Sequence, residues 1–376
     1  MNNEATNSTQ QDWIEISDPA QLPDMPVVSV LMLTYNHGPY LGEAIEGVVN
    51  QKTDFPVELL IGEDCSKDNT LQVALDYQKK YPQIIRILHA CPNSGVAENF
   101  SRLIRESRGE FSAFCEGDDY WIDDQKLADQ IRLIRGNEGI SLVHADHVVR
   151  HDFWRRKFIV QPRGRFADYP DKTCLAGDIS EKCFGGMVTH TSTVLCRSKN
   201  LKEYLATEFV TSAGFAYDLC IVNYLALQGQ AAYLDRPVSA YRITPGSLMR
   251  SGVKGALKLA VEIRDFFLRF STQYGKYASR REAIYRDYTL VILKSSFRLD
   301  EKEMFHAAAR DLKKLSLNSN ERFTVRWHEQ LFKYPLARSL ATQAAFFVQA
   351  VRKNIHMALI YTGMVERLTL RRTANS

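Results

Sequence analysis

The sequence lacks an apolar run long enough to cross a membrane. A spanning helix needs roughly 18 or more consecutive apolar residues, and no segment of the 376 residues reaches that length. Residues 1–18 are polar and lack the basic-then-apolar order of a secretory signal. We therefore expect a cytoplasmic protein.

Clustered cysteines and a strong net charge are missing as well. Seven cysteines are scattered along the chain without a CxxC pair, which predicts free thiols rather than a disulfide framework or a zinc site. A net charge of +4 is too weak to indicate a nucleic-acid partner. His144, His147 and His151 are close in sequence, but a strand would alternate them between its faces, which argues against zinc.

Several common catalytic motifs are also absent. The chain contains no HExxH, no GxxxxGK[ST], no GxSxG and no GxGxxG. These absences argue against a zincin-type metalloprotease, a P-loop nucleotidase, an α/β-hydrolase and a dinucleotide-binding protein, in that order. The chemistry therefore has to come from other residues.

Strand-like and helix-like segments alternate through the first third of the chain. Residues 26–36 form an almost unbroken β-favouring run, as in a strand covered on both faces. Residues 39–51 follow with apolar side chains at helical spacing. The alternation continues through 57–64, 70–81, 84–90, 96–107, 110–119 and 124–135. This order predicts an α/β fold with a mixed, mostly parallel sheet flanked by helices.

The remainder of the chain changes character twice. Between 140 and 245 the pattern is mixed. We expect strands at 141–149 and 191–197, a helix at 216–229 and two short strands at 231–235 and 238–242. From about 254 the pattern is helical to the end. We predict a flexible lead-in over 1–25, an α/β domain over 26–250 and a helical C-terminal region over 251–376.

Three turns stand where such a sheet would bind a ligand. In open α/β sheets, ligands bind beyond the carboxyl ends of the strands. That rule points to the turns "TYN" at 34–36, "GEDCSKDNT" at 62–70 and "CEGDDYW" at 115–121. In the second turn, Ser66 and Asp68 are explained equally well as residues that cap the next helix. Asp64 ends a buried strand, where its carboxylate could instead accept from a nucleobase or a ribose.

The third turn crowds three carboxylates after an apolar strand. Glu116, Asp118 and Asp119 lie within four positions, and like charges this close repel unless a cation offsets them. Mg²⁺ and Mn²⁺ bind through one or two carboxylates together with substrate phosphates. We therefore expect a divalent cation facing a diphosphate. The alternative is a solvated acidic loop over Tyr120 and Trp121.

Four motifs taken together resemble a known family. "VSVLMLTYN", "GEDCSKDNT", "NSGVAENF" and "CEGDDYW", in this order and at these intervals, closely resemble the family 2 inverting glycosyltransferases, which have the GT-A fold. The resemblance covers roughly 27–250, so that 26–250 would be a GT-A domain. It implies a hexosyltransferase-type enzyme that moves a sugar from a nucleotide-diphosphate sugar to an acceptor hydroxyl with inversion. The pathway implied is surface polysaccharide or lipopolysaccharide synthesis in the cell envelope.

The resemblance also implies roles for individual residues. Asp118 matches the metal-binding aspartate, with Mg²⁺ or Mn²⁺ as the cofactor. Asp218, eleven residues before Gly229, matches the catalytic base. His190 and Thr191 match an acceptor-side segment. Residues in donor-binding positions are Thr34, Tyr35, Asn36, Asp64, Asn93, Glu116, Asp119 and Arg242.

Three positions depart from the family pattern. Glu116 replaces the usual first aspartate, Cys65 stands where glycine is usual, and Thr244 stands where many relatives carry a metal-binding histidine. The last change weakens the implied metal site. It keeps open an alternative function, in which the chain is a non-catalytic nucleotide-sugar-binding or interaction protein on the same fold.

The C-terminal region lies outside the resemblance. From Lys333 onward the chain carries seven Lys and Arg residues against one acid. These helices would either pack on the catalytic domain or contact the anionic inner face of a membrane, where lipid-linked acceptors are found. The expected partners are a nucleotide-diphosphate sugar donor and a saccharide or lipid-linked acceptor, without nucleic acid.

Overall fold

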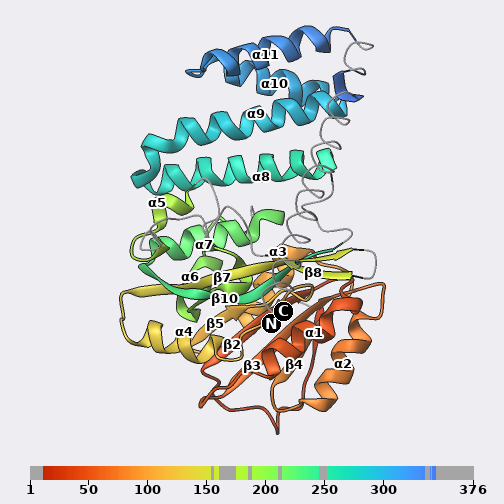
Figure 1. Ribbon diagram of the computed structural model, residues 1–376, viewed down its shortest axis with the longest axis vertical. Helices are drawn as coiled ribbons and strands as arrows, with labels where there is room; N and C mark the ends of the chain where they lie inside the picture. Colours follow the sequence, from red (N-terminus) through yellow and green to blue (C-terminus); the bar gives the residue numbers. More distant parts are fainter. Residues whose placement is uncertain are drawn as a thin grey trace, which may run out of the picture. The chain divides into compact units, whose positions relative to one another are not determined.

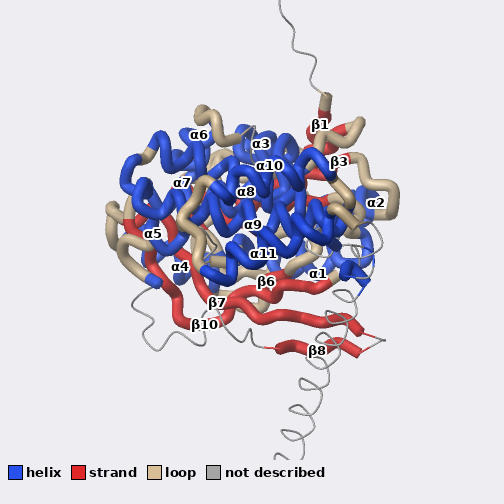
Figure 2. The backbone as a smooth tube through the Cα atoms, turned by 90° about the horizontal axis from the view of Figure 1, so that it is seen from above, coloured by secondary structure: helices blue, strands red, loops and turns tan. Residues whose placement is uncertain are grey.

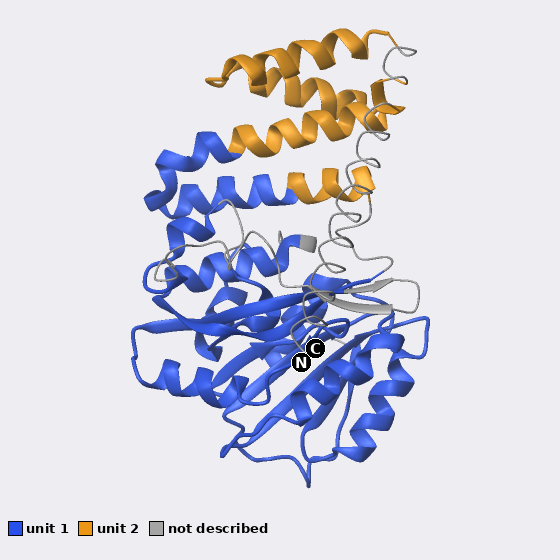
Figure 3. Cartoon of the chain, viewed as in Figure 1, with its two compact units in different colours: residues 1–251, 262–284 blue, residues 252–261, 285–376 orange. Residues whose placement is uncertain are grey.

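The computed structural model divides the chain into two compact units (Figure 3). Unit 1 comprises Met1–Ser251 and Glu262–Ile284, and unit 2 comprises Gly252–Val261 and Tyr285–Ser376. The functional boundaries predicted after residues 25 and 250 stay predictions. The structure describes residues 12–153, 156–160, 175–184, 189–210, 214–244, 252–334, 339 and 341–343.

Four parallel strands form the first half of the sheet in unit 1. They are β2 (Val28–Thr34), β3 (Val57–Asp64), β4 (Ile85–Ala90) and β5 (Phe111–Phe114), in the spatial order β4-β3-β2-β5. Every residue of β2 is buried, as expected for an apolar run with helices on both of its faces. The predicted mixed α/β fold with helices around a central sheet is confirmed.

Helices cover both faces of this sheet (Figure 1). On one face, α1 (Gly38–Val49), α2 (Thr70–Lys80) and α4 (Lys126–Arg135) share a single apolar core with the strands. On the other, α3 (Val96–Glu106) packs against β2 and β3, and it also contacts α6 (Ser198–Leu205). Next to α6 lies α7 (Tyr217–Leu227). The two helical layers shield the strands from water and leave the strand ends free for a site.

The second half of the sheet contains mixed pairings. β9 (Leu195–Arg197) is antiparallel to both β5 and β7 (Ile140–Phe153), and β7 runs parallel to β10 (Gln230–Ile243). Figure 2 shows β7 and β10 side by side. The short strands β6 (Tyr120–Trp121) and β8 (Arg156–Val160) pair with β10 and β7, respectively.

Three local features differ from the sequence prediction. β10 is one continuous strand, whereas two short strands were expected; the register shifts on both sides of Pro237, which has no N–H for the ladder. Thr191–Thr193 is a 3₁₀ turn rather than the start of a strand, because the Thr193 N–H and hydroxyl both bond to the carbonyl of His190. β1 (Trp13–Ile16), within the segment expected to be a flexible lead-in, pairs antiparallel with β4.

The chain after β10 is helical, as predicted, over the residues that the structure describes. α8 (Gly252–Gln273) and α9 (Arg281–Leu299) each contribute to both units. Unit 2 continues with α10 (Lys302–Lys313) and α11 (Ser319–Phe332), whose first turn is closed by a capping box between Asn318 and Glu321. Among the helices in the described ranges, none has the length and apolarity to cross a bilayer.

Candidate functional site

The carboxyl ends of the parallel strands bring four turns to one edge of the sheet. β2, β3, β4 and β5 end at Thr34, Asp64, Ala90 and Phe114, and the turn after each strand begins there. Because neighbouring parallel strands end at the same edge, these turns are adjacent in space. The sequence prediction of a site at the turns after β2, β3 and β5 rests on this arrangement of the strand ends.

The turns after β2 and β3 are bonded to each other. The backbone of Asn36 is in the left-handed region with φ +56°. Its N–H donates to the Ser66 hydroxyl (3.0 Å), and its side-chain oxygen accepts from the Lys67 N–H (2.8 Å). Thr34 is buried, and its hydroxyl has no partner among the described residues, while Tyr35 is 40% exposed. Of the three residues predicted to line the donor pocket, Tyr35 and Asn36 are thus presented to solvent, and Thr34 is not.

The carboxylate of Asp64 is held by the turn after β4. It accepts from the Ser94 N–H (2.8 Å), the Ser94 hydroxyl (2.6 Å) and the Gly95 N–H (2.8 Å). The side-chain amide of Asn93 donates to the Asp64 backbone carbonyl (2.7 Å). A carboxylate offers about four acceptor positions, so these bonds leave about one for a ligand. Because Asp64 is only 2% exposed, a ligand can reach it only when the turn after β4 moves.

The acidic turn after β5 packs tightly against the end of β2. The Gly117 N–H donates to the Leu33 carbonyl (2.8 Å). A Cβ at this glycine would lie 2.9 Å from Nδ1 of His37 and 3.0 Å from Cβ of Thr34. A larger residue would force the His37 ring or the Thr34 side chain to shift, so glycine suits the close packing of this turn. It places Glu116 and Asp118 beside the residues that follow β2.

The carboxyl group of Glu116 is only partly hydrogen-bonded. Its Oε1 accepts from the Tyr217 hydroxyl (3.3 Å), whereas its buried Oε2 has no partner among the described residues. Burial, together with the negative charges of Asp118 and Asp218, raises the pKa of Glu116 to about 7. A carboxylate oxygen in a low-dielectric site without a donor is one that a cation would stabilise.

The two other acids of the turn differ in their surroundings. The Asp118 side chain is 24% exposed, with Nε2 of His37 4.0 Å from its Oδ2. Asp119 is buried and accepts from the Arg242 N–H (2.9 Å), while its second oxygen lies 3.9 Å from Nε2 of His190. Burial and the neighbouring acids raise the pKa of Asp119 well above its ordinary value. Asp119 therefore ties the acidic turn to β10 and lies beside His190, the residue before the 3₁₀ turn.

Arg242 is engaged within the protein. Its guanidinium is 2% exposed, donates from Nε to the Asp118 carbonyl (2.8 Å) and from Nη2 to Glu43 (2.8 Å), and lies 5.0 Å from the ring centre of Tyr120. Glu43 also accepts from Arg150 (2.6 Å). This cluster fixes α1 against β7 and β10. The predicted contact of Arg242 with a diphosphate stays a prediction.

Asp218 lies on the same edge as the acidic turn. It occupies the first turn of α7, directly after Tyr217, whose hydroxyl bonds to Glu116. The charge of Asp218 is close enough to contribute to the raised pKa of Glu116. Burial raises the pKa of Asp218 itself to about 6, although its Oδ1 accepts from the Leu219 N–H (2.7 Å). A carboxylate with this pKa is a stronger base than ordinary aspartate and is still largely ionised at neutral pH.

The two residues predicted to contact the acceptor have different exposure. His190 is 20% exposed, and its Nδ1 bonds with the Ser192 hydroxyl (2.7 Å). Its ring lies 4.8 Å from that of Tyr241 on β10. Thr191 is 3% exposed and lies beneath the surface. His190 is thus the one of the two that faces the acidic turn, through Asp119.

The donor set at this edge fits a divalent cation bound by few protein ligands. Glu116 offers an unpartnered buried oxygen and Asp118 a partly exposed carboxylate. Within the described ranges, no three or more His, Cys, Asp or Glu side chains form a preassembled metal-binding group. Mg²⁺ and Mn²⁺ characteristically take one or two protein carboxylates and complete their shell with phosphate and water. Thr244, next to β10, is buried at 6% exposure. It offers a hydroxyl at the position where the family pattern of the sequence analysis has a metal-binding histidine.

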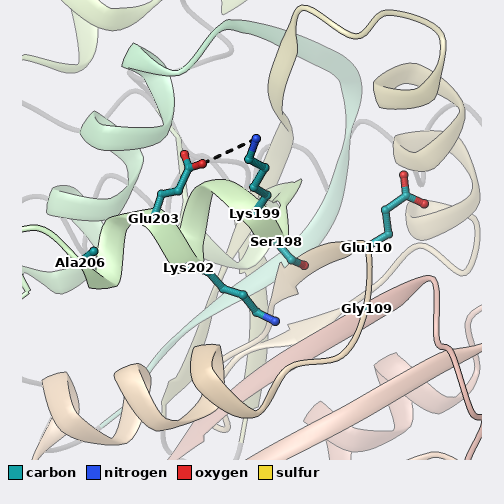
Figure 4. Close-up of a pocket in the computed structure, with 7 residues that line it drawn as sticks. All are labelled: Gly109, Glu110, Ser198, Lys199, Lys202, Glu203 and Ala206. Atoms are coloured by element: carbon teal, nitrogen blue, oxygen red, sulfur yellow. Dashed lines mark ion pairs between the residues drawn. The ribbon is translucent and has the colours of Figure 1, made fainter.

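A separate surface hollow lies at the opposite end of β5. It has a volume of about 640 Å³ and is lined by Gly109, Glu110, Ser198, Lys199, Lys202, Glu203 and Ala206 (Figure 4). Gly109 and Glu110 precede β5, whereas the acidic turn follows it. Lys199 and Glu203 form an ion pair across one helical turn (3.8 Å), and Lys202 donates to the Ser107 carbonyl. The hollow is therefore distinct from the site at the carboxyl edge.

Sequence reasoning missed two side chains that contact the acidic turn. Tyr217 donates to Glu116, and His37 lies beside Asp118. A signal for each was present, because Tyr217 adjoins the predicted base and His37 follows the "TYN" motif directly. Neither residue type at those positions indicates by itself which acid it meets.

Comparison with known proteins shows a similar family and a similar fold. Residues 29–194, somewhat less than half of the chain, match the model of glycosyl transferase family 2. A mannosyltransferase of Pyrobaculum calidifontis, solved with GDP-mannose and Mn²⁺, superposes with a TM-score of 0.50 at 15% identity, covering 92% of this chain and 91% of its own. At this identity the likeness concerns the fold, which is that of the GT-A glycosyltransferases.

Relatives in sequence match over different lengths. An uncharacterised protein of Mycobacterium tuberculosis is 38% identical over 126 residues, which is 33% of this chain and 36% of that protein. The chain therefore spans about a third of this relative's length. A putative teichuronic acid biosynthesis glycosyltransferase of Bacillus subtilis is 25% identical over 240 residues, covering 62% of this chain and 85% of the relative. Together with the family match, these likenesses support a family 2 GT-A fold.

Proposed function

We propose that the protein transfers a sugar from a nucleotide-diphosphate sugar to an acceptor hydroxyl, with inversion at the anomeric carbon. The observation that carries this proposal is the meeting of two groups at one edge of the sheet. The acidic turn with Glu116 and Asp118 faces α7, where Tyr217 contacts Glu116 and Asp218 follows directly. The pairing brings a cation-binding turn and a carboxylate base together beside the turns after β2 and β3.

Asp218 is the base in this reaction. Its carboxylate takes the proton of the acceptor hydroxyl while that oxygen forms a bond to the anomeric carbon and the bond from this carbon to the diphosphate breaks. Attack from the face opposite the leaving nucleoside diphosphate inverts the configuration. The raised pKa, about 6, makes the carboxylate more basic without leaving it protonated at pH 7.

The other residues bind and orient the donor. Tyr35 and Asp64 face the nucleoside from the turns after β2 and β3, and Asn93 holds the Asp64 backbone. Glu116 and Asp118 would hold Mg²⁺ or Mn²⁺, which supplies positive charge against the diphosphate when bound. Asp119 and Arg242 keep this turn in place through their mutual bond. His190 lies where an acceptor sugar would approach.

The class of product follows from the relatives. The Bacillus relative is named for teichuronic acid biosynthesis, and a similar substrate here would be a growing surface polysaccharide or lipopolysaccharide. The alternative is a non-catalytic protein that binds a nucleotide sugar on the same fold. This alternative stays open because Thr244 stands where many relatives carry a metal-binding histidine.

A donor screen distinguishes these functions. Nucleotide-diphosphate sugars should be tested by thermal shift with and without Mn²⁺, because a ligand at 100 times its Kd stabilises the native state by about 2.7 kcal/mol. We expect one donor to raise the Tm by several degrees, only with the cation, and slow release of its nucleoside diphosphate. Binding without hydrolysis or transfer to any acceptor would favour the non-catalytic alternative. No binding by any donor would overturn both.

Contact with an anionic membrane is proposed for α11. The basic segment after Lys333 on which the sequence prediction rested lies largely outside the described residues. Within them, Phe323 (65% exposed) and Trp327 (51%) stack on the outer face of α11 at 5.9 Å. Arg322 and Arg326 flank them, also exposed. Aromatic side chains bordered by arginines are the pattern of a helix face that lies in the interface of an anionic bilayer.

Vesicle binding tests this contact in the full chain. The double substitution Phe323→Ser and Trp327→Ser should reduce sedimentation with phosphatidylglycerol vesicles by at least about fivefold, because both aromatic anchors are lost. Binding to phosphatidylcholine vesicles should be weak for all variants. Met304→Ser, at an exposed apolar residue on α10, is the matched control. Unchanged binding of the double variant, or a change in its oligomeric state instead, would contradict the proposal.

A further inference from the structure

Two cysteines face each other at the same edge of the sheet. In the register of β3 and β4, Glu63 lies opposite His89 and Asp64 opposite Ala90. Cys65 and Cys91 are the residues that directly follow these two strands, and their Sγ atoms are in contact at 2.7 Å. Cys91 is exposed and Cys65 partly so, whereas the other cysteines of the described residues are buried.

The backbone at Cys65 has a conformation that is unfavourable for a residue with a side chain. Its φ of +59° lies in the left-handed region, which costs a residue with a Cβ roughly 1–2 kcal/mol compared with the right-handed one. Glycine would adopt this conformation without that cost. A cysteine at this position directs a thiol toward the second exposed cysteine, on the turn after β4.

The pair lies at the turns that enclose Asp64. Cys65 follows Asp64 directly, and the Asp64 carboxylate is covered by the N–H groups of Ser94 and Gly95, three and four residues after Cys91. A ligand that bonds to Asp64 therefore requires the turn after β4 to move away from the turn after β3. A covalent bond between Cys65 and Cys91 would keep these turns together.

We propose that Cys65 and Cys91 form a reversible disulfide that holds the nucleotide pocket closed. The proposal builds on the proposed function, because it assigns a regulatory modification to the donor side of that site. The reduced pair lets the turn after β4 open, and the oxidised pair holds it over Asp64. The nucleotide-sugar pocket would thereby respond to the thiol redox state of its surroundings.

The reaction needs a two-electron oxidant, either a peroxide or a low-molecular-weight disulfide. With hydrogen peroxide, one thiolate is oxidised to a sulfenic acid and releases water, and the second thiol displaces a further water to form the disulfide. With glutathione disulfide, two successive exchanges through a mixed disulfide release two glutathione molecules. The hydrogen bond with Cys91, partial burial and the nearby acids raise the pKa of the Cys65 thiol, so oxidation is slower than at an acidic thiol.

Thiol mapping and nucleotide binding test the proposal in the full chain. The protein is equilibrated with glutathione disulfide or with dithiothreitol, alkylated, digested and analysed by mass spectrometry. We expect a Cys65–Cys91 cross-linked peptide, lighter by two hydrogens, only after oxidation. UDP and GDP, each with Mn²⁺, are the probes for thermal shift. We expect the affinity of whichever binds to fall about 5–150-fold on oxidation and to return with dithiothreitol.

Coupling is reciprocal, so saturating nucleotide should also shift the thiol–disulfide equilibrium toward the reduced pair by the same factor. Cys91→Ser should bind nucleotide with the same affinity in both redox conditions. Cys65→Gly, whose glycine suits the left-handed backbone, should give the same result. This second variant keeps the test valid if the serine variant misfolds. Absence of the cross-linked peptide would overturn the disulfide. A disulfide that leaves affinity unchanged would overturn the closure of the pocket. If neither these nucleotides nor any donor of the screen binds the reduced protein, the proposed function fails, and the closure with it, while the peptide map still decides the modification.

Discussion

Asp218→Asn should reduce sugar transfer by about 10²–10⁴-fold while leaving donor affinity within about threefold. The expected loss is that of a general base, and the amide has nearly the same shape as the carboxylate. Asp218 lies on α7 beside the acidic turn, and its carboxylate accepts from the Leu219 N–H of the same helix, so donor binding should persist. Transfer is measured as release of nucleoside diphosphate in the presence of acceptor, and affinity by thermal shift.

The same substitution should stabilise the protein. The pKa of Asp218 is raised to about 6 in the folded chain from 3.8 in the unfolded one, so the folded state resists ionisation. Above pH 6 the cost of ionising Asp218 in the folded state lowers the free energy of unfolding. Asparagine does not ionise, so the variant should have a free energy of unfolding higher by roughly 1–3 kcal/mol. The gain should shrink as the pH falls from 6 toward 4. Lost activity with a higher Tm excludes misfolding as the cause.

The pH profile of the wild-type enzyme gives an independent check. The rate at saturating donor should rise with pH through about 6, as Asp218 loses its proton. Because Asp218 and Glu116 influence each other, the apparent value belongs to the pair. Asp76→Asn, at an exposed position on α2, serves as the control that changes charge without touching the site. Asp218→Asn retaining most of the transfer activity would contradict the assignment of the base.

Asp118→Asn should abolish the effect of Mn²⁺ on donor binding. The partly exposed Asp118 and the unpartnered Oε2 of Glu116 are the two carboxylate groups that the turn offers to a cation. Losing one should weaken cation-dependent donor binding by at least about tenfold and lower the transfer rate about 10²–10³-fold, as for other losses of electrostatic stabilisation at developing charge. Without Mn²⁺, wild type and variant should bind the donor equally weakly.

Two further variants make this test specific. Glu116→Gln should also lose the Mn²⁺ effect, yet should unfold at higher temperature above pH 7, because the buried carboxylate with a pKa of about 7 no longer has to ionise. Tyr217→Phe removes one hydrogen bond to Glu116. It should reduce the contribution of Mn²⁺ to donor binding by a smaller amount, about 1 kcal/mol. If Asp118→Asn bound donor as tightly as wild type with Mn²⁺, the cation site would have to lie elsewhere.

Much of the fold could be predicted because its signals are local. The strand over 57–64 and the helix over 70–81, which the structure ends at Lys80, were predicted from apolar periodicity and from the turn residues between them. Parallel pairing then placed the three polar turns at one edge. Of the strand predicted over 191–197, the first part was wrong, because the bonds of Thr193 to the His190 carbonyl favour a 3₁₀ turn there over the extended chain.

The sequence by itself determined the order of strands and helices, the acidic turn and the aspartate in the first turn of α7, since each depends on neighbours within a few residues. Only the tertiary structure decided which side chains meet across long separations. Tyr217 meets Glu116 over 101 residues, Glu43 meets Arg242 over 199, and Cys65 meets Cys91 over 26. The physical reason is that these contacts depend on the register and packing of elements that are distant in the chain, which no local periodicity specifies.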